Sequence, residues 1–204
     1  MTENKGIMLV VSGPAGSGKG TVNAMLLKRD DFAFSVSATT RAARPGEVDG
    51  VNYHFITKES FLERIDSGDM LEYTEYCGNF YGTPLKEAEE VLRSGKNLIL
   101  EIEVEGAMNV KRKYPDAVLV LLLPPSYSVQ EARLRGRGTE TEEKILLRLA
   151  RAKEEVALAD CYDYVVYNYD NRADEAAAHI LSIVDAEKCS IKRNDRVADK
   201  YLNS

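Results

Sequence analysis

A glycine-rich loop near the N-terminus constrains the fold of this chain more than any other feature. Residues 13–21 read Gly-Pro-Ala-Gly-Ser-Gly-Lys-Gly-Thr and lie between an apolar run, Ile7–Val11, and a segment of helical periodicity, Lys19–Arg29. This is the Gly-x4-Gly-Lys spacing of a P-loop in the strand–loop–helix context that the motif requires. Glycines let consecutive backbone N–H groups converge on phosphate oxygens, and the helix N-terminus adds positive potential. The sequence therefore predicts a nucleotide-binding α/β fold.

The loop supplies the candidate contacts to a nucleoside triphosphate. Lys19 is a point charge suited to the terminal phosphates, but Gly20 stands where the P-loop pattern has a magnesium-binding Ser or Thr. A hydroxyl follows one residue later at Thr21, so we expect its magnesium contact to pass through water. The bland alternative is a glycine turn that caps an ordinary helix. The expected triphosphate-binding residues of the loop are Gly13, Pro14, Ala15, Gly16, Ser17, Gly18, Lys19, Gly20 and Thr21.

Strand-like and helix-like segments alternate along most of the chain, whose 204 residues suit one domain with inserted pieces. Apolar runs at 97–103, 117–123 and 164–168 join Ile7–Val11 as predicted buried strands of a parallel sheet. The helix-like segments are 19–29, 84–94, 105–113, 128–135, 140–159 and 172–187. This alternation predicts a parallel sheet with helices on its flanks.

Two stretches break the alternation. Residues 32–83 contain several strand-like runs, the first at 32–40, and one helix near 58–66, which predicts a small, mostly antiparallel insert. A second, helical insert is expected at 125–159, which is rich in arginine. The expected division is a core of 1–31, 84–124 and 160–187, inserts at 32–83 and 125–159, and a polar tail at 188–204.

Composition narrows the function classes. The net charge of −6 disfavours a general nucleic-acid binder, which usually presents a basic face. The longest apolar run, 117–123, is far shorter than the ~20 residues of a membrane span, and the polar start of the chain predicts no signal peptide. We therefore expect a cytoplasmic protein without membrane or nucleic-acid partners. The cysteines, Cys77, Cys161 and Cys189, lack metal-site spacing and are expected to be reduced thiols.

A second phosphate site is predicted after the strand-like run at residue 32. Arg41 and Arg44 stand three positions apart there, and Tyr53 and Tyr81 follow. Guanidinium forks and phenolic hydroxyls both donate to phosphate oxygens, so this set suits a phosphate monoester. Because a P-loop alone leaves a GTPase, an ATPase or a kinase open, this second site favours a kinase.

From Gly6 to about Ile183 the sequence resembles the guanylate kinases. The motifs that carry the resemblance are Ser-Val-Ser-Ala-Thr-Thr-Arg-x-x-Arg-x-Gly-Glu, Gly-Asn-Phe-Tyr-Gly-Thr and Gly-Arg-Gly-Thr-Glu-Thr-Glu-Glu. The resemblance implies a P-loop kinase core with a parallel sheet and flanking helices, a small mixed α+β GMP-binding insert at 32–83 and a helical lid at 125–159. It also implies phosphoryl transfer from ATP to GMP, giving ADP and GDP, with Mg²⁺ accompanying ATP. Acceptance of dGMP stays open.

The resemblance assigns the GMP contacts. Arg41, Arg44, Tyr53 and Tyr81 would hold the phosphate, and Ser37, Glu72 and Thr83 would read the guanine, with Glu103 near it. The chemistry agrees, since guanine's N1–H and amino group are donors for a carboxylate, whereas its O6 and N7 accept from hydroxyls. Adenine reverses the donor and acceptor at these edges, and a buried polar mismatch of that kind discriminates by roughly 10⁴ or more. Taken singly, Thr83 could be a helix N-cap, Glu72 a solvated carboxylate and Ser37 a turn residue.

Three acidic residues follow the strand at 97–100. Alternation along an extended chain turns Glu101 and Glu103 the same way, and Glu105 too if the strand continues. The resemblance puts the first beside the GMP arginines and the second near guanine and magnesium, so Glu103 and Thr21 are the candidates for contacting magnesium through water. The family commonly has Asp and Gln at positions 103 and 105. Three exposed loop acids are the alternative.

Arginines gather in the second insert of this acidic protein. Arg133, Arg137 and Arg148 match lid positions of the family and are expected to contact phosphate. For Arg135 and Arg151 a salt-bridged helix surface stays open as an alternative, because glutamates surround them. The resemblance also places Asn168 near the adenine of ATP. The expected catalytic residues are Lys19, Arg41, Arg137 and Arg148.

The expected chemistry needs no general base, because the phosphate of GMP is already mostly ionised at pH 7. Catalysis is then in-line positioning and charge stabilisation, completed by closure of the arginine-bearing segment. Three alternatives compete: a kinase for another base such as AMP, which Glu72 and Thr83 disfavour; a non-catalytic phosphoprotein-binding module; and a GTPase, for which the Asn-Lys-x-Asp motif is absent.

Overall fold

The computed structural model describes residues 5–76, 78–136, 138, 141–194 and 197–203. Two residues singled out from the sequence, Cys77 and Arg137, lie outside this described part. Cys161 and Cys189, which lie inside it, are free thiols, as predicted.

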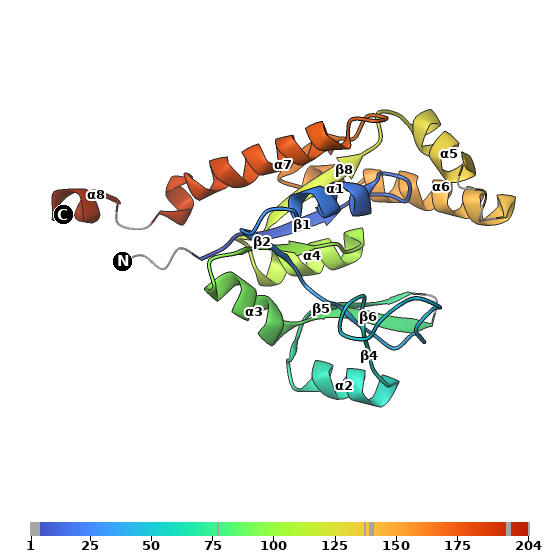
Figure 1. Ribbon diagram of the computed structural model, residues 1–204, viewed down its shortest axis with the longest axis horizontal. Coiled ribbons are helices and arrows are strands. Elements are labelled where there is room, and N and C mark those ends of the chain that lie inside the picture. Colours follow the sequence, from blue (N-terminus) through green and yellow to red (C-terminus); the bar gives the residue numbers. More distant parts are fainter. Residues whose placement is uncertain (1–4, 77, 137, 139–140, 195–196, 204) are drawn as a thin grey trace.

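A five-stranded parallel sheet forms the centre of the molecule (Figure 1). Its order is β2 (Phe32–Phe34), β7 (Asn97–Leu100), β1 (Met8–Ser12), β8 (Val118–Leu123) and β9 (Tyr164–Tyr167), and every neighbouring pair is parallel. β1, β7 and most of β8 are buried, which explains why these strands are continuous apolar runs rather than alternating ones. The predicted parallel sheet is confirmed.

Helices cover both faces of this sheet (Figure 1). α1 (Lys19–Leu26) and α7 (Ala173–Lys188) contact each other on one face, and α3 (Leu85–Arg93) and α4 (Val104–Lys113) lie on the other. Alternate side chains of β1 point to opposite faces, so its odd-numbered residues join the core under α1 and α7 and its even-numbered residues the core under α4. The two cores hold the carboxyl ends of β1 and β7 side by side.

A second, smaller sheet lies beside the core. Its order is β4 (His54–Phe55), β3 (Ala38–Thr39), β6 (Asn79–Pro84) and β5 (Met70–Tyr76), antiparallel except for the β3–β4 pair. Helix α2 (Lys58–Asp66) packs on it through the buried Phe61, which stacks on Phe80 with ring centroids 5.4 Å apart. A mostly antiparallel unit with one helix is what the sequence predicts for this stretch.

The predicted strand at 32–40 proved wrong as a single element of the insert. Its first part, Phe32–Phe34, pairs with β7 in the core sheet, and only Ala38–Thr39 belongs to the second sheet. The crossing occurs at Ser35–Ser37, where the Ser35 N–H still donates to the Ile99 carbonyl at 3.3 Å. Phe32 and Phe34 before the crossing, and Thr39 and Thr40 after it, all favour strand, so propensity hides the change of partner. Phe32–Phe34 therefore belongs to the core sheet.

Two further helices lie over the glycine loop. α5 (Tyr127–Gly136) and α6 (Glu142–Val156) pack through Leu134, Ile145 and Leu149, and Ala15 of the loop joins this cluster. A 3₁₀ turn at Ala159–Cys161 leads from α6 to β9. The chain segment at 125–159 is thus helical, as predicted, and it touches the loop directly.

The C-terminal end projects from the body of the molecule. After α7 come a 3₁₀ turn, Ile191–Arg193, and the short helix α8 (Val197–Leu202), which extends away in Figure 1. Within the described ranges, every helix is too short or too polar to cross a bilayer.

Candidate active site

The glycine loop connects β1 to α1 in a conformation that only glycine adopts easily. Gly13, Gly16 and Gly18 have φ values of 150°, 86° and 89°. A Cβ at Gly13 would lie 2.1 Å from the Leu122 carbonyl oxygen, and one at Gly18 would lie 2.3 Å from the Asn168 side-chain nitrogen. These close approaches explain the glycines and fix the loop against β8 and the end of β9.

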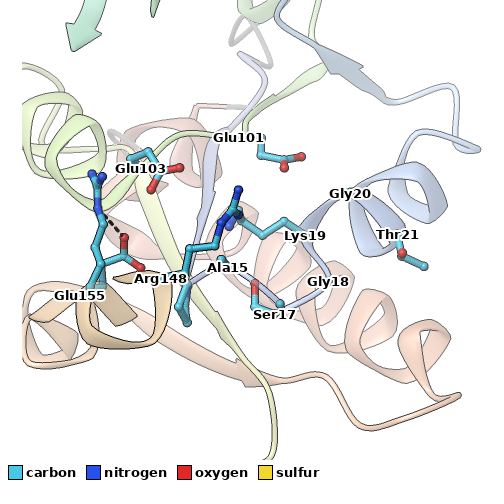
Figure 2. Close-up of a pocket in the computed structure, with 13 residues that line it drawn as sticks. Ala15, Ser17, Gly18, Lys19, Gly20, Thr21, Glu101, Glu103, Arg148 and Glu155 are labelled. Atoms are coloured by element: carbon cyan, nitrogen blue, oxygen red, sulfur yellow. Dashed lines mark ion pairs between the residues drawn. The ribbon is translucent and has the colours of Figure 1, made fainter. Parts of the chain in front are cut away.

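The loop lines a cleft of about 350 Å³ at the carboxyl edge of the sheet. Glu101 and Glu103, which follow the end of β7, line it together with Arg148 and Glu155 of α6 (Figure 2). Arg151 of α6 is a further charged lining residue. The structure thus brings together three residues proposed from the sequence, Lys19, Glu103 and Arg148. Ligands of open parallel α/β sheets bind at this edge.

Lys19 and Thr21 take different directions from the first turn of α1. The Lys19 ammonium donates to the Gly13 carbonyl across the loop and faces the cleft. Figure 2 shows the Thr21 side chain directed away from Lys19. Of the two candidates for a water-mediated magnesium contact, Glu103 is therefore the better placed.

Buried polar atoms without hydrogen-bond partners concentrate around this edge. Within the described part of the chain they include Ser17 Oγ, Asn23 Oδ1, Ser35 Oγ and Asn168 Oδ1. Ser35 and Asn168 lie just beyond the carboxyl ends of their strands, and Ser17 lies in the loop. Because such atoms are rare in folded proteins, their concentration here is typical of a binding site.

Three of the four predicted phosphate-binding residues of the insert meet at one place. The Arg41 guanidinium lies 5.4 Å from the Tyr53 ring centroid, and the Tyr53 and Tyr81 rings are 6.1 Å apart. Arg41 forms a two-pronged ion pair with Glu47, at 2.8 Å for each bond, and this pairing lowers the pKa of Glu47 to about 2. Arg44 lies in the same loop, where its backbone N–H donates to Glu47 at 2.7 Å.

Glu72 and Thr83 form a buried pair on β5 and β6. Their residue exposures are 5% and 1%, and the Thr83 hydroxyl donates to the Glu72 carboxylate at 2.8 Å. Burial raises the pKa of Glu72 to about 7, and the hydrogen bonds from Thr83 oppose this rise. The N-cap of α3 is Pro84, without a side-chain bond, so the helix-cap alternative for Thr83 is wrong. Ser37 precedes Ala38, which pairs with Gly82 next to Thr83.

Glu101 lies between the two sets of phosphate-binding candidates. It lines the cleft with Lys19. Burial and Tyr81 raise the pKa of Tyr53, Arg41 lowers it, and the charge of Glu101 adds a smaller rise. Asn23 of α1, which is 2% exposed, holds Glu101 through a hydrogen bond of 2.7 Å from Nδ2. Sequence reasoning missed Asn23, whose one signal is its position one helical turn after Lys19.

Glu105 does not lie beside Glu101 and Glu103, contrary to the alternation expected for a continuing strand. β7 ends at Leu100 and α4 begins at Val104, so Glu105 already sits in the first helical turn. It lines a separate hollow of about 610 Å³ together with Glu72.

Arg133 and Asn168 brace the glycine loop. Arg133 donates to the carbonyls of Gly16, at 3.2 Å, and Asn168, at 2.8 Å, and pairs with Asp170 at 2.7 Å. The Asn168 amide donates to the Ser17 carbonyl at 2.8 Å.

The two arginines for which a salt-bridged helix surface was an alternative both form ion pairs in the structure. Arg135 pairs with Glu131 and Glu142, as the surface alternative predicts. Arg151 also pairs with a glutamate of its own helix, Glu155, at 3.4 Å, as the same alternative predicts, and it lines the cleft as well.

Comparison with known proteins gives the family. A guanylate kinase family model matches residues 5–187. The guanylate kinase of Halalkalibacterium halodurans is 48% identical over 202 residues, which cover 98% of this chain and 97% of the relative. That of Lactococcus lactis subsp. lactis is 48% identical over 200 residues, covering 98% and 95%. The chain belongs to the guanylate kinase family.

The fold comparison agrees with this assignment. The crystal structure of guanylate kinase from Anaplasma phagocytophilum superimposes with a TM-score of 0.74 at 34% identity, covering 93% of this chain and 90% of that one. Membership of the guanylate kinase family confirms the predicted enzyme class and reaction, ATP-dependent phosphorylation of GMP. The AMP-kinase and GTPase alternatives are thereby set aside.

Proposed function

We propose that this enzyme transfers the γ-phosphoryl group of ATP to GMP between two adjacent substrate sites, an ATP site and a GMP site, that meet at Glu101. The glycine loop with Lys19 forms the ATP side, and the Arg41 cluster with the buried Glu72–Thr83 pair forms the GMP side. The observation that carries this assignment is the position of Glu101, which lines the cleft with Lys19 and directly follows β7, the strand beside which the chain crosses into the insert at Ser35. In this proposal the two sites face one common gap.

On the ATP side, the backbone N–H groups of residues 13–21 would bind the phosphates, and Lys19 would neutralise the terminal ones. Arg148 lines the cleft and is a candidate for the phosphoryl group in transfer. Arg137 keeps the same expected role but lies outside the described residues. Arg133 and Asn168 hold the loop backbone, and the unpartnered Asn168 Oδ1 is available to an adenine amino group.

On the GMP side, the Glu72 carboxylate would accept from the guanine N1–H and amino group, while Thr83 and Ser37 hydroxyls face O6 and N7. Arg41, Arg44, Tyr53 and Tyr81 would donate to the 5′-phosphate. The Arg41–Glu47 ion pair keeps the guanidinium in place before GMP arrives. In this proposal the Glu72–Thr83 pair on β5 and β6 selects guanine over adenine. The segment with Arg41 and Arg44 positions the phosphate of GMP.

The residues at the cleft fit Mg²⁺ bound with ATP. Carboxylates are the hard oxygen ligands that this ion prefers, and Glu101 and Glu103 both line the cleft beside the glycine loop. Glu103 would bind the ion through water, with Thr21 as the weaker candidate. When bound, the ion neutralises charge on the phosphates of ATP. We also propose that the two inserts act as a GMP-binding segment and a closing lid.

The chain's own groups position the reactants and need not take up a proton. GMP carries a phosphate that is already ionised near neutral pH, so its oxygen attacks without a base. Lys19 and the arginines of the lid stabilise the transferring group, while Arg41 fixes the acceptor. The substrates ATP and GMP favour the cytoplasmic location expected from the sequence.

A coupled assay with Mg-ATP and four acceptors, GMP, dGMP, AMP and UMP, tests this function. We expect GMP turnover to exceed that of AMP by roughly 10⁴, because adenine leaves Glu72 unpaired. Glu72→Gln should cut that preference by at least tenfold, whereas Glu75→Gln, an exposed carboxylate on the same strand, should not. Equal use of AMP by the unmodified enzyme would refute the proposal, and dGMP turnover reports whether the ribose hydroxyl is read.

A further inference from the structure

Glu155 is a buried carboxylate at the nucleotide cleft, and it takes no part in the mechanism proposed above. It lies near the end of α6, has a relative exposure of 9%, and lines the cleft with the glycine loop (Figure 2). The next residue back, Glu154, is exposed. Carboxylates are rarely buried unless they are paired, so the burial of Glu155 calls for partners within the cleft.

The partners of Glu155 come from three elements. On its own helix, Arg151 lies one turn earlier, and its Nε is 3.4 Å from the Glu155 carboxylate (dashed line in Figure 2). From the segment between β7 and α4, the Glu103 carboxyl lies within hydrogen-bonding reach. From the glycine loop, Lys19 lies close enough to attract its charge. Glu155 therefore connects the lid helix to the cations and acids of the core.

The burial of Glu155 next to Glu103 is expected to lower the free energy of unfolding, so stability alone does not explain it. Glu155 is buried on the lid helix beside a second carboxyl, that of Glu103, and it forms an ion pair with Arg151 at 3.4 Å. A neutral glutamine would fill the same space and could hydrogen-bond to Glu103 without placing two carboxylates together. Buried polar groups that cost stability are typical of functional sites.

Holding Arg151 in place is a function that would explain why an unfavourably buried carboxylate is present here. The backbone of Arg151 lies on α6, one helical turn after Arg148, and both arginines line the cleft with the loop. An arginine side chain has many rotamers, so an exposed one loses entropy when it is held toward a ligand. An acidic partner that is itself fixed by burial reduces that loss before the ligand binds.

We propose that Glu155 is a positioning residue for phosphoryl transfer, which holds Arg151 toward the triphosphate in the cleft that it shares with Lys19. This inference rests on the proposed ATP side of the active site. Glu155 does not touch the reacting atoms and moves no proton in this account. It acts through Arg151, so its loss should weaken ATP handling and leave guanine recognition intact.

The test compares Glu155→Gln with Glu154→Gln, which makes the same charge change one residue away on the exposed face. For Glu155→Gln we expect kcat/KM for ATP to fall about tenfold with KM for GMP changed less than twofold. Its melting temperature should be equal to or above that of the unmodified enzyme, since a buried charge is removed. Glu154→Gln should match the unmodified enzyme in all three measurements. A residue with only a structural role would lower the melting temperature and leave the ATP parameter alone.

A double-mutant cycle with Arg151→Gln keeps the proposal falsifiable. In that background Glu155→Gln should cause no further loss in kcat/KM for ATP, because the group it holds is already gone. Should Glu155→Gln fail to fold, Glu155→Asp is run through the same cycle, since it keeps the charge but shortens the reach to Arg151. Additive losses, or unchanged ATP kinetics in Glu155→Gln, would overturn the inference while GMP phosphorylation by the unmodified enzyme stands. Absence of that phosphorylation would overturn the proposed function itself.

Discussion

The hydroxyl of Thr83 donates to the carboxylate of Glu72 at 2.8 Å, inside a site where Glu72 is 5% exposed and its pKa is raised to about 7. The donor occupies one lone pair of the carboxylate and leaves others for a ligand. An ionised Glu72 in such a place is costly until donors arrive, and the guanine edge supplies two of them. Selectivity and acid–base behaviour of the enzyme are therefore linked at one residue.

The affinity for GMP should depend on pH through Glu72. Protonated Glu72 cannot accept from both guanine donors, so KM for GMP should rise as pH falls below about 7. The slope approaches about tenfold per pH unit well below that value. Steady-state kinetics between pH 5.5 and 8.5 measure it, with Glu75→Gln as the matched control; a flat KM in the unmodified enzyme would contradict the role given to Glu72.

The free energy of unfolding should also depend on pH through Glu72, but in the opposite direction: ionised Glu72 favours GMP binding and destabilises the ligand-free fold. The pKa of Glu72 is about 7 in the folded chain against a model value of 4.5, so the folded state binds the proton more tightly. The contribution of Glu72 to the free energy of unfolding is fully present below pH 4.5 and is lost as pH rises through about 7. Glu72→Gln should therefore stabilise the ligand-free enzyme at pH 8 by at most about 3 kcal/mol. Urea denaturation at pH 5 and pH 8 checks this, and an equal change at both values would count against it.

Gly18 should be irreplaceable by alanine. Its φ is 89° and a Cβ would lie 2.3 Å from the Asn168 side-chain nitrogen, so Gly18→Ala should lower the free energy of unfolding by about 2 kcal/mol or more. Gly20→Ala meets no atom within 4 Å and lies inside α1, so it should leave stability unchanged or raise it by up to about 1 kcal/mol. Thermal denaturation of both variants measures the difference. Similar melting temperatures for the two would show that the Asn168 contact is not tight.

Asn23 should matter for catalysis through Glu101. Asn23→Asp replaces the 2.7 Å hydrogen bond with repulsion between two carboxylates, and we expect kcat to fall about tenfold or more. Ala24→Asp adds the same charge on the exposed side of α1 and is the control. Stopped-assay kinetics on both variants decide the matter, and a normal kcat in Asn23→Asp would show that Glu101 needs no support from α1.

Motif and period predicted the parts of the molecule that depend on local sequence. The loop at 13–21 and the buried strands around it follow from spacing and apolar runs alone, and the resemblance led to the Glu72–Thr83 pair. The change of sheet at Ser35–Ser37 could not be predicted, because pairing partners are a tertiary choice. The direction of Glu105 depended on whether the strand continued, and the helix start at Val104 ends the alternation before this residue, close to the start of the helix-like segment predicted at 105.

The two positioning residues were missed for a similar reason. Asn23 meets Glu101 across 78 positions of sequence, and Glu155 meets Glu103 only because α6 folds back over the loop. Their spacing offers a weak signal, since each lies four residues after a residue already singled out, Lys19 and Arg151. Four-residue spacing is common on every helix, so only burial in the folded chain distinguishes them.

A crystal structure of the enzyme with GMP and a non-hydrolysable ATP analogue is the most direct test that the ATP site and the GMP site meet at Glu101. We expect guanine to bind Glu72 and Thr83, the GMP phosphate to bind Arg41, and the γ-phosphoryl analogue to lie beside Lys19 in line with the GMP oxygen. A GMP phosphate bound away from Arg41, or separated from the ATP analogue by Glu101 with no common gap, would contradict it.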